Sequence, residues 1–157
     1  MKIEEHFLRL SIESAARARA RGNHPFGALL TVDGRVVLSA ENTVNTERDP
    51  TAHAETNLIR QAVRQLEPEE LSRSTLYTSC EPCAMCVGAI YWAGVREVIY
   101  ALSCTELAKL AGGDFLIPCR ELFARAGRRV EVAGPLLAEE AIKVHEGYWS
   151  QARIPLA

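Results

Sequence analysis

Residues 76–86 read Leu76-Tyr77-Thr78-Ser79-Cys80-Glu81-Pro82-Cys83-Ala84-Met85-Cys86, and this stretch decides the fold around it. Residues 75–79 are rich in strand-forming side chains and predict a short strand that runs into Cys80. A helix is expected next, beginning near Cys83 and ending around Gly94. The stretch therefore predicts a strand that leads into a helix, with Cys83 and Cys86 on one face of the helix's first turn.

Hydrophobic periodicity and turn residues predict the remaining elements outward from this stretch. On the N-terminal side these are an amphipathic helix over 4–21, a hairpin of strands 27–31 and 36–39 around Asp33-Gly34, and a helix over roughly 51–66 opened by Pro50. On the C-terminal side they are a strand over 96–101, helices over 104–111 and 118–126 with a bend at Gly112-Gly113, a strand over 129–132 and a closing amphipathic helix over 136–150. This order predicts one three-layer α/β/α domain over residues 1–157, with a mixed sheet of about five strands.

Composition limits the class of protein. The chain has 157 residues, of which 48% are apolar and 24% charged, and no tract is biased, so we expect one globular domain. The N-terminus lacks a signal-peptide pattern and no apolar run is long enough to span a bilayer, which predicts a cytoplasmic protein without membrane contact. The net charge is −2 and the sequence has no long basic run, which argues against a nucleic-acid partner, because proteins that bind many phosphates usually have a basic face.

Three residues form a candidate metal site. His53 precedes Cys83 and Cys86, and histidine and cysteine are good zinc ligands. A set of three protein ligands leaves a fourth position for water, which is the pattern of catalytic zinc, whereas structural zinc is closed by four. We therefore expect one Zn²⁺ per chain, held by His53, Cys83 and Cys86.

Glu55 is the candidate catalytic residue. It follows His53 by two positions, close enough to reach a water at the metal. A carboxylate there can take a proton from the water, deliver it to a ring nitrogen and then protonate a departing amine. The combination of H-x-E with P-C-x-x-C is the signature of zinc deaminases, so the residues predict hydrolytic deamination with release of ammonia.

Other interpretations of the cysteines remain open. Cys80, Cys83 and Cys86 begin like an iron–sulfur motif, but the next ligand position holds Ile90. A structural zinc closed by Cys80 would leave Glu55 without a purpose. In a reducing compartment, Cys80, Cys104 and Cys119 are expected to be buried thiols. A non-enzymatic, zinc-stabilised binding module is the alternative from a different functional class.

From His24 to about Tyr100, the sequence resembles the cytidine deaminase superfamily, within the branch of bacterial guanine deaminases and tRNA adenosine deaminases. The matching pieces are Pro25-Phe26-Gly27-Ala28, Asn42, Asp49-Pro50-Thr51-Ala52-His53-Ala54-Glu55 and residues 76–86. The resemblance implies zinc binding and proton transfer by the residues named above, and ring contacts from Phe26 and Asn42. Backbone groups of Ala54 and Ser79 can add to these contacts, since a planar base needs an apolar wall and hydrogen-bonding partners at its edge. The competing interpretations are a core aromatic for Phe26 and a loop-capping amide for Asn42.

The resemblance also guides the expected substrate and assembly. The continuation Val87-Gly88-Ala89-Ile90-Tyr91-Trp92-Ala93 is similar to guanine deaminases, so guanine to xanthine is the leading expectation. By position, Asp114 matches their purine-selecting acid, and Tyr148 or Trp149 matches their enclosing aromatic residue; a helix cap and core aromatics are the alternatives. Nucleoside, cytosine or aminotriazine, and tRNA adenosine deamination remain alternative activities. The resemblance implies a homodimer, for which Tyr91 and Trp92 are either contact residues or core residues.

Overall fold

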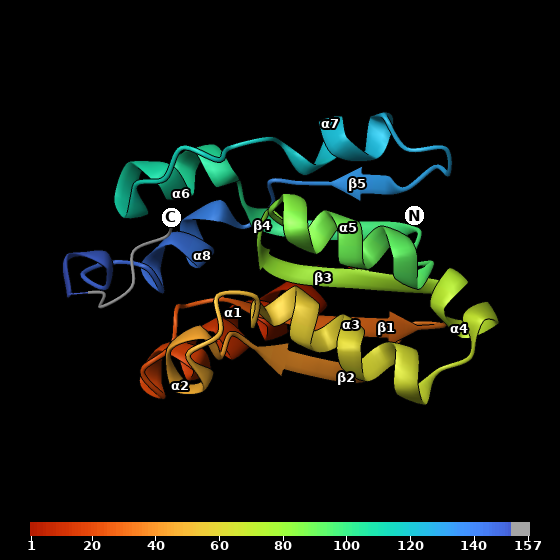
Figure 1. Ribbon diagram of the computed structural model, residues 1–157, viewed down its shortest axis with the longest axis horizontal. Helices are drawn as coiled ribbons and strands as arrows, with labels where there is room; N and C mark the ends of the chain where they lie inside the picture. Colours follow the sequence, from red (N-terminus) through yellow and green to blue (C-terminus); the bar gives the residue numbers. More distant parts are fainter. Residues whose placement is uncertain (152–157) are drawn as a thin grey trace.

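A computed structural model describes residues 1–151 and contains one five-stranded mixed sheet (Figure 1). The strands are β1 (Gly27–Val32), β2 (Arg35–Glu41), β3 (Ser74–Cys80), β4 (Glu97–Leu102) and β5 (Glu131–Ala133). Their order across the sheet is β2-β1-β3-β4-β5. β1 runs antiparallel to both neighbours, while β3, β4 and β5 are mutually parallel. The predicted α/β class and the mixed five-stranded sheet are confirmed.

Helices cover both faces of this sheet, as the layered architecture requires. They are α1 (Glu5–Ala20), α2 (Val44–Glu47), α3 (Ala54–Gln65), α4 (Pro68–Ser72), α5 (Ala84–Ala93), α6 (Cys104–Ala111), α7 (Cys119–Ala124), α8 (Ala138–Lys143) and the 3-10 turn η1 (Trp149–Gln151). In Figure 1, α3 and α5 lie in front of the sheet and α1 lies behind it. α3 packs against α5, which packs against α7. Arg9 of α1 forms an ion pair with Glu140 of α8 at 3.0 Å.

The central strands are apolar because helices cover both of their faces. All six residues of β1 are buried, and five of the six residues of β4 are buried. Gly27 is required where α1 crosses the start of β1, since a Cβ there would lie 2.4 Å from the Ser14 Cβ. This close approach fixes the chain next to Phe26, which is one wall of the site described below.

Several predicted boundaries were wrong. The helix expected over 51–66 begins at Ala54, because His53 is extended (φ −69°, ψ 156°) and serves as the N-cap. The closing helix expected over 136–150 is limited to α8 and η1, since Leu137 (φ 56°) and Gly147 (φ 70°) adopt left-handed conformations. α2 and α4 were missed, although Glu67 and Glu70 form a capping box at the start of α4.

No helix within residues 1–151 is both long enough and apolar enough to cross a membrane.

A buried histidine makes the stability of this fold sensitive to acid. His145 is 1% exposed, stacks on Trp149 and accepts a hydrogen bond from the Trp149 indole at 3.3 Å. Burial, with a smaller effect of Arg19, lowers the pKa of His145 from 6.5 to about 4. The unfolded chain therefore binds the extra proton more readily between these two values, and stability falls as the pH drops through this window.

We expect His145 to account for up to about 3 kcal/mol of destabilisation between pH 7 and pH 4. Urea unfolding of the protein and of His145→Asn at both pH values measures this effect, because proton binding elsewhere cancels in the difference between the two proteins. An equal loss of stability in both proteins would contradict the prediction.

Candidate active site

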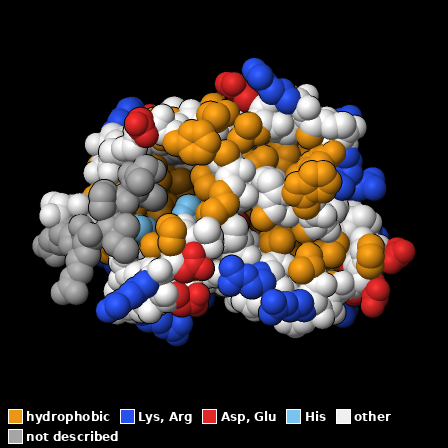
Figure 2. All heavy atoms as spheres, in the orientation of Figure 1, with side chains coloured by type: hydrophobic (Ala, Val, Ile, Leu, Met, Phe, Trp, Pro, Cys, Tyr) orange, Lys and Arg blue, Asp and Glu red, His pale blue; other side chains and the backbone are white. Residues whose placement is uncertain are grey.

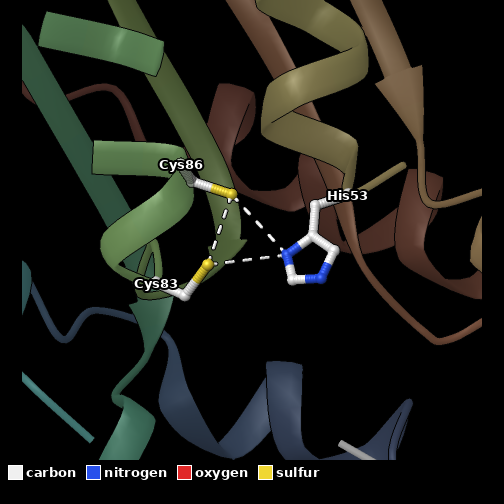
Figure 3. A group of neighbouring side chains, drawn as sticks. All are labelled: His53, Cys83 and Cys86. Carbon is white, nitrogen blue, oxygen red and sulfur yellow. Dashed lines mark hydrogen bonds between the residues drawn. The ribbon is translucent and has the colours of Figure 1, made fainter. Parts of the chain in front are cut away.

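Two helix starts bring the three candidate ligands together (Figure 3). His53 is the N-cap of α3 and Cys83 is the N-cap of α5, while Cys86 lies in the first turn of α5. Because α3 and α5 pack side by side, their N-termini meet at one point although the ligands lie 30 residues apart in sequence. The predicted grouping of His53, Cys83 and Cys86 is present in the structure.

The distances between the three donor atoms fit a tetrahedral zinc ion. Cys83 Sγ and Cys86 Sγ each lie 3.6 Å from His53 Nδ1, and the two sulfurs are 3.7 Å apart. Zn–S bonds of about 2.3 Å and Zn–N bonds of about 2.0–2.1 Å at tetrahedral angles require about 3.8 Å between sulfurs and about 3.6 Å between sulfur and nitrogen. The three side chains therefore already hold the spacing that zinc requires.

The two thiols are unequal. The hydrogen-bonding contact between Cys83 and Cys86 lowers the pKa of Cys83 to about 4, despite the opposing effect of burial, and His53 contributes to the same lowering. The same contact, together with burial and the charge of Glu55, raises the pKa of Cys86. One thiolate therefore forms easily, and a bound cation favours the second because thiolates are the metal-binding form.

Glu55 lies in the first turn of α3 and is 5% exposed. Its Oε2 atom is 3.5 Å from Cys86 Sγ, so the carboxylate borders the ligand cluster. Burial raises the pKa of Glu55, and a hydrogen bond from Thr78 partly offsets that rise. A raised pKa makes a carboxyl group a better proton acceptor, as a proton shuttle requires.

Thr78 is a site residue that sequence reasoning missed. Its hydroxyl donates to Glu55 Oε1 at 2.6 Å, and it also lies 3.0 Å from the carbonyl oxygen of Cys80. Thr78 is fully buried on central strand β3 and fixes the carboxylate next to the metal ligands. The sequence signal that could have identified Thr78 is its position in the stretch 76–86. It lies two residues before Cys80 and therefore on the same face of the strand as Cys80.

We expect Thr78→Val to lower kcat by about tenfold with little change in zinc content, because the near-isosteric side chain removes one hydrogen bond from the carboxylate. Thr78→Ser keeps the hydroxyl and should retain most of the activity. Steady-state kinetics of both variants test this, and an undiminished kcat in the valine variant would remove the orienting role.

A cavity of about 310 Å³ opens beside the ligand cluster. Its walls are mainly apolar and come from His24, Phe26, Val44, Pro50, His53, Glu55, Cys80, Glu81, Cys83, Met85, Cys104, Leu107, Ala108, Gly112, Gly113, Phe115, Leu116 and Ile117. Figure 2 shows hydrophobic side chains around a hollow in which histidine atoms are visible. The volume and the apolar walls suit a small planar ligand.

The predicted substrate contacts divide into two groups. Phe26 lines the cavity, whereas Asn42, Ala54 and Ser79 are buried but not among its wall residues. Asn42 Oδ1 accepts from the Val44 amide at 3.1 Å, as a capping amide would, and within residues 1–151 its Nδ2 atom has no hydrogen-bond partner.

The Ser79 side chain accepts a hydrogen bond from the backbone, and the Asp114 side chain is exposed to solvent. Ser79 Oγ accepts from the Gly27 amide at 3.1 Å. Asp114 is exposed, although its neighbours Gly113 and Phe115 both line the cavity. Asp114 itself is not among the residues that line the cavity.

The C-terminal aromatics pack behind Phe26. Trp149 lies 6.0 Å from Phe26 and 5.3 Å from His24, measured between ring centroids. The Tyr148 hydroxyl accepts from Asn45 Nδ2 at 3.3 Å. Both aromatic side chains are half-buried and support the cavity wall from behind.

The remaining cysteines lie outside the metal cluster. Cys80 and Cys119 are buried thiols, as predicted, whereas Cys104 is partly exposed and lines the cavity. Within residues 1–151 the one group of three or more close metal-binding side chains is His53, Cys83 and Cys86. A structural zinc closed by Cys80 and an iron–sulfur cluster therefore lack the ligands they need.

Comparisons with known proteins agree with this site. The family model of the cytidine and deoxycytidylate deaminase zinc-binding region matches residues 1–102. A probable cytosine deaminase of Schizosaccharomyces pombe is 41% identical over 94% of this chain and 93% of its own length. A guanine deaminase of Bacillus subtilis is 43% identical over 72% of this chain and 73% of its own length.

A solved structure has the same fold. A guanine deaminase from Nitrosomonas europaea superposes with a TM-score of 0.82 at 25% identity, covering 96% of this chain and 86% of that one. The matched family region includes all three ligands and Glu55. The chain therefore belongs to the cytidine and deoxycytidylate deaminase zinc-binding family and is a zinc-dependent hydrolytic deaminase.

Proposed function

We propose that this protein deaminates a free nucleobase, with guanine, converted to xanthine and ammonia, as the leading substrate. The observation that carries the proposal is the small apolar cavity, which has the metal ligands and Glu55 at one end. A single base fits a cavity of about 310 Å³, and the sequence has no long run of basic residues for binding a polyanion. Similarity to the guanine deaminases of two bacteria supports guanine.

Glu55 carries out the proton transfers of the proposed reaction. Zinc held by His53, Cys83 and Cys86 would supply an acidified water. Glu55 borders the ligand cluster, so it is placed to take a proton from the attacking water and to deliver it to the ring nitrogen next to the amine-bearing carbon. Glu55 would then move the remaining proton of the added hydroxyl group to the amine, so that the C–N bond breaks, ammonia leaves and the ring carbon keeps the water oxygen as a carbonyl. Phe26 provides an apolar wall for the ring.

Cytosine is a second candidate substrate. The probable cytosine deaminase of Schizosaccharomyces pombe matches 94% of this chain, against 72% for the guanine deaminase of Bacillus subtilis. In addition, Asp114 is exposed and is not among the wall residues, and Glu55 and Glu81 are the acidic residues among the walls within the described part of the chain. The small number of acidic wall residues favours a ring that needs fewer polar partners than guanine does.

Ammonia release by the zinc-loaded protein tests the proposal. The substrates are guanine, guanosine, adenine, adenosine, cytosine, cytidine, an aminotriazine and a tRNA anticodon stem-loop. Preference for guanine supports the leading substrate, and preference for cytosine replaces it within the same chemistry. Activity confined to nucleosides or tRNA contradicts free-base deamination, and no release from any of them would favour a zinc-stabilised binding module.

If Asp114 turns inward to select a purine, Asp114→Asn should lower kcat/KM for guanine by about tenfold and leave cytosine unaffected, because one charged hydrogen bond is lost. Asp33→Asn, which changes an exposed carboxylate of the β1–β2 hairpin, is the matched control. Unchanged turnover of every substrate would end the selector role.

We also infer a homodimer in the cytoplasm. Trp92 is 84% exposed at the end of the apolar helix α5, and such an aromatic is typical of an interface. Tyr91 is partly buried and its hydroxyl accepts from the Arg128 amide at 3.1 Å, so it contributes to the core as well. A mass by light scattering of about twice 17.3 kDa would support the dimer, and a mass near 17.3 kDa would contradict it. The five free cysteines suit a reducing compartment.

A further inference from the structure

Glu81 is a buried carboxylate that the proton transfers do not use. It is 7% exposed and lies two residues before the metal ligand Cys83. The ion pairs found within residues 1–151 do not include Glu81. A buried charge needs strong hydrogen-bonding partners, so its contacts indicate what it does.

Backbone amides at two helix starts supply those partners. Glu81 Oε2 accepts from the amide of Cys104 at 3.1 Å, and Oε1 accepts from the amide of Cys119 at 2.8 Å. Cys104 is the first residue of α6 and Cys119 is the first residue of α7. The Glu81 amide in turn donates to the carbonyl of Leu102 at the end of β4 at 2.7 Å. One side chain therefore joins the zinc loop to both ends of the segment 104–119.

This segment forms one wall of the cavity. Its wall residues are Leu107, Ala108, Gly112, Gly113, Phe115, Leu116 and Ile117, in addition to Cys104. Gly112 (φ 73°) and Gly113 (φ 106°) give the middle of the segment a sharp bend, and Phe115 is 61% exposed. With an exposed centre and a glycine bend, the segment depends on its two ends for its position relative to the metal ligands.

We propose that Glu81 is a positioning residue that sets the distance between the zinc loop and the cavity wall formed by segment 104–119, and thereby sets substrate affinity. The Glu81 carboxylate also contributes, after burial, to raising the pKa of Cys104 to about 11 and the pKa of Cys119, which places both thiols next to it. This inference rests on the proposed free-base deamination for its kinetic consequence, but the contacts themselves can be tested without substrate.

Glu81→Gln is the first test, because an amide can accept through one atom only and its NH₂ group would face the second backbone N–H. Hydrogen–deuterium exchange at Cys104 or Cys119 should accelerate about tenfold or more, since one amide loses its acceptor. KM for the best free base should rise about tenfold or more, with kcat changed less than about threefold and zinc content unchanged. Glu121→Gln, an exposed change on α7, should leave exchange and kinetics as they are.

If Glu81→Gln does not fold, a second pair of variants tests the positioning role of Glu81. Cys104→Pro removes the amide that Glu81 accepts from, at the first helical position, where proline is tolerated. The preceding Ser103 is already extended (φ −73°, ψ 153°), as a residue before proline should be. Cys104→Ala removes the thiol but keeps the amide and is therefore the reference. KM should be higher in the proline variant than in the alanine variant, with similar kcat and zinc content.

The outcomes separate this inference from the proposed function. Unchanged exchange in Glu81→Gln, or equal KM values in Cys104→Pro and Cys104→Ala, overturns the positioning role. Loss of zinc in Glu81→Gln would also overturn it, because the carboxylate would then support the metal site and not the wall. If the wild-type protein releases ammonia from no free base, the proposed function fails, while the exchange experiment still tests the contacts of Glu81.

Discussion

Glu55→Gln is expected to lower kcat by about 10²–10⁴-fold while the protein still binds one zinc per chain, because the amide cannot carry a proton between water, ring and amine. The fold should persist, since the Thr78 hydroxyl that donates to Glu55 Oε1 at 2.6 Å can donate equally to the amide oxygen. Ammonia release and zinc content of the purified variant measure the two effects separately.

The matched control for this variant is Glu13→Gln, an exposed change on α1 far in sequence from the site. It should match the wild-type protein in both kcat and zinc content. A Glu55→Gln protein that binds zinc and retains full kcat would contradict the assigned proton shuttle.

Removal of one metal ligand should have a second large effect, a loss of zinc affinity and of turnover. Cys86→Ala is expected to weaken zinc binding by more than about a hundredfold, because changes to groups that merely support metal ligands already cost about 10–100-fold. Turnover should fall with it, and chelation of the wild-type protein should abolish turnover until Zn²⁺ is restored. Competition with a chromogenic chelator measures the affinity.

Cys80→Ala is the matched control, because Cys80 is a buried neighbour outside the ligand group. It should bind zinc as tightly as the wild-type protein does. Full zinc affinity in Cys86→Ala, or its loss in Cys80→Ala, would show that the ligand set is misassigned.

The Cys83–Cys86 pair and the position of Glu55 near His53 were predictable because each spacing lies within one helix start, whereas the meeting of the two helix starts was inferred from the ligand chemistry. Two cysteines three positions apart at a helix start present both sulfurs on one face, and the two-residue step from His53 to Glu55 crosses one helix N-terminus. The strand before Cys80 was equally visible from its residue types. Chemistry that depends on short spacing within one element can therefore be inferred from sequence.

Thr78 and Glu81 were not assigned because their roles depend on contacts between distant segments. Thr78 meets Glu55 from 23 positions away, and Glu81 meets the amide of Cys119 from 38 positions away. No periodic pattern encodes such contacts. The contacts of Glu81 follow from the parallel pairing of β3 with β4, which sets the start of α6 beside the zinc loop.

The C-terminal third was predicted least well for a related reason. Its helices are short, and their ends are set by residues in left-handed conformations, such as Leu137 at φ 56°. A leucine gives no sequence signal for that conformation, unlike the glycine at Gly147. The predicted domain over 1–157 includes residues 152–157, which lie outside the described part of the chain. The zinc chemistry follows from the family, whose matched region ends at residue 102, and the substrate is a proposal.

The measurement that tests the central claim most directly is turnover of free guanine and free cytosine by the zinc-loaded protein in water enriched in ¹⁸O. We predict that at least one base yields a product with one ¹⁸O at the carbon that carried the amine, together with one ammonia per turnover. Absence of product from both bases, or a product without ¹⁸O, would contradict hydrolytic deamination of a free base by this protein.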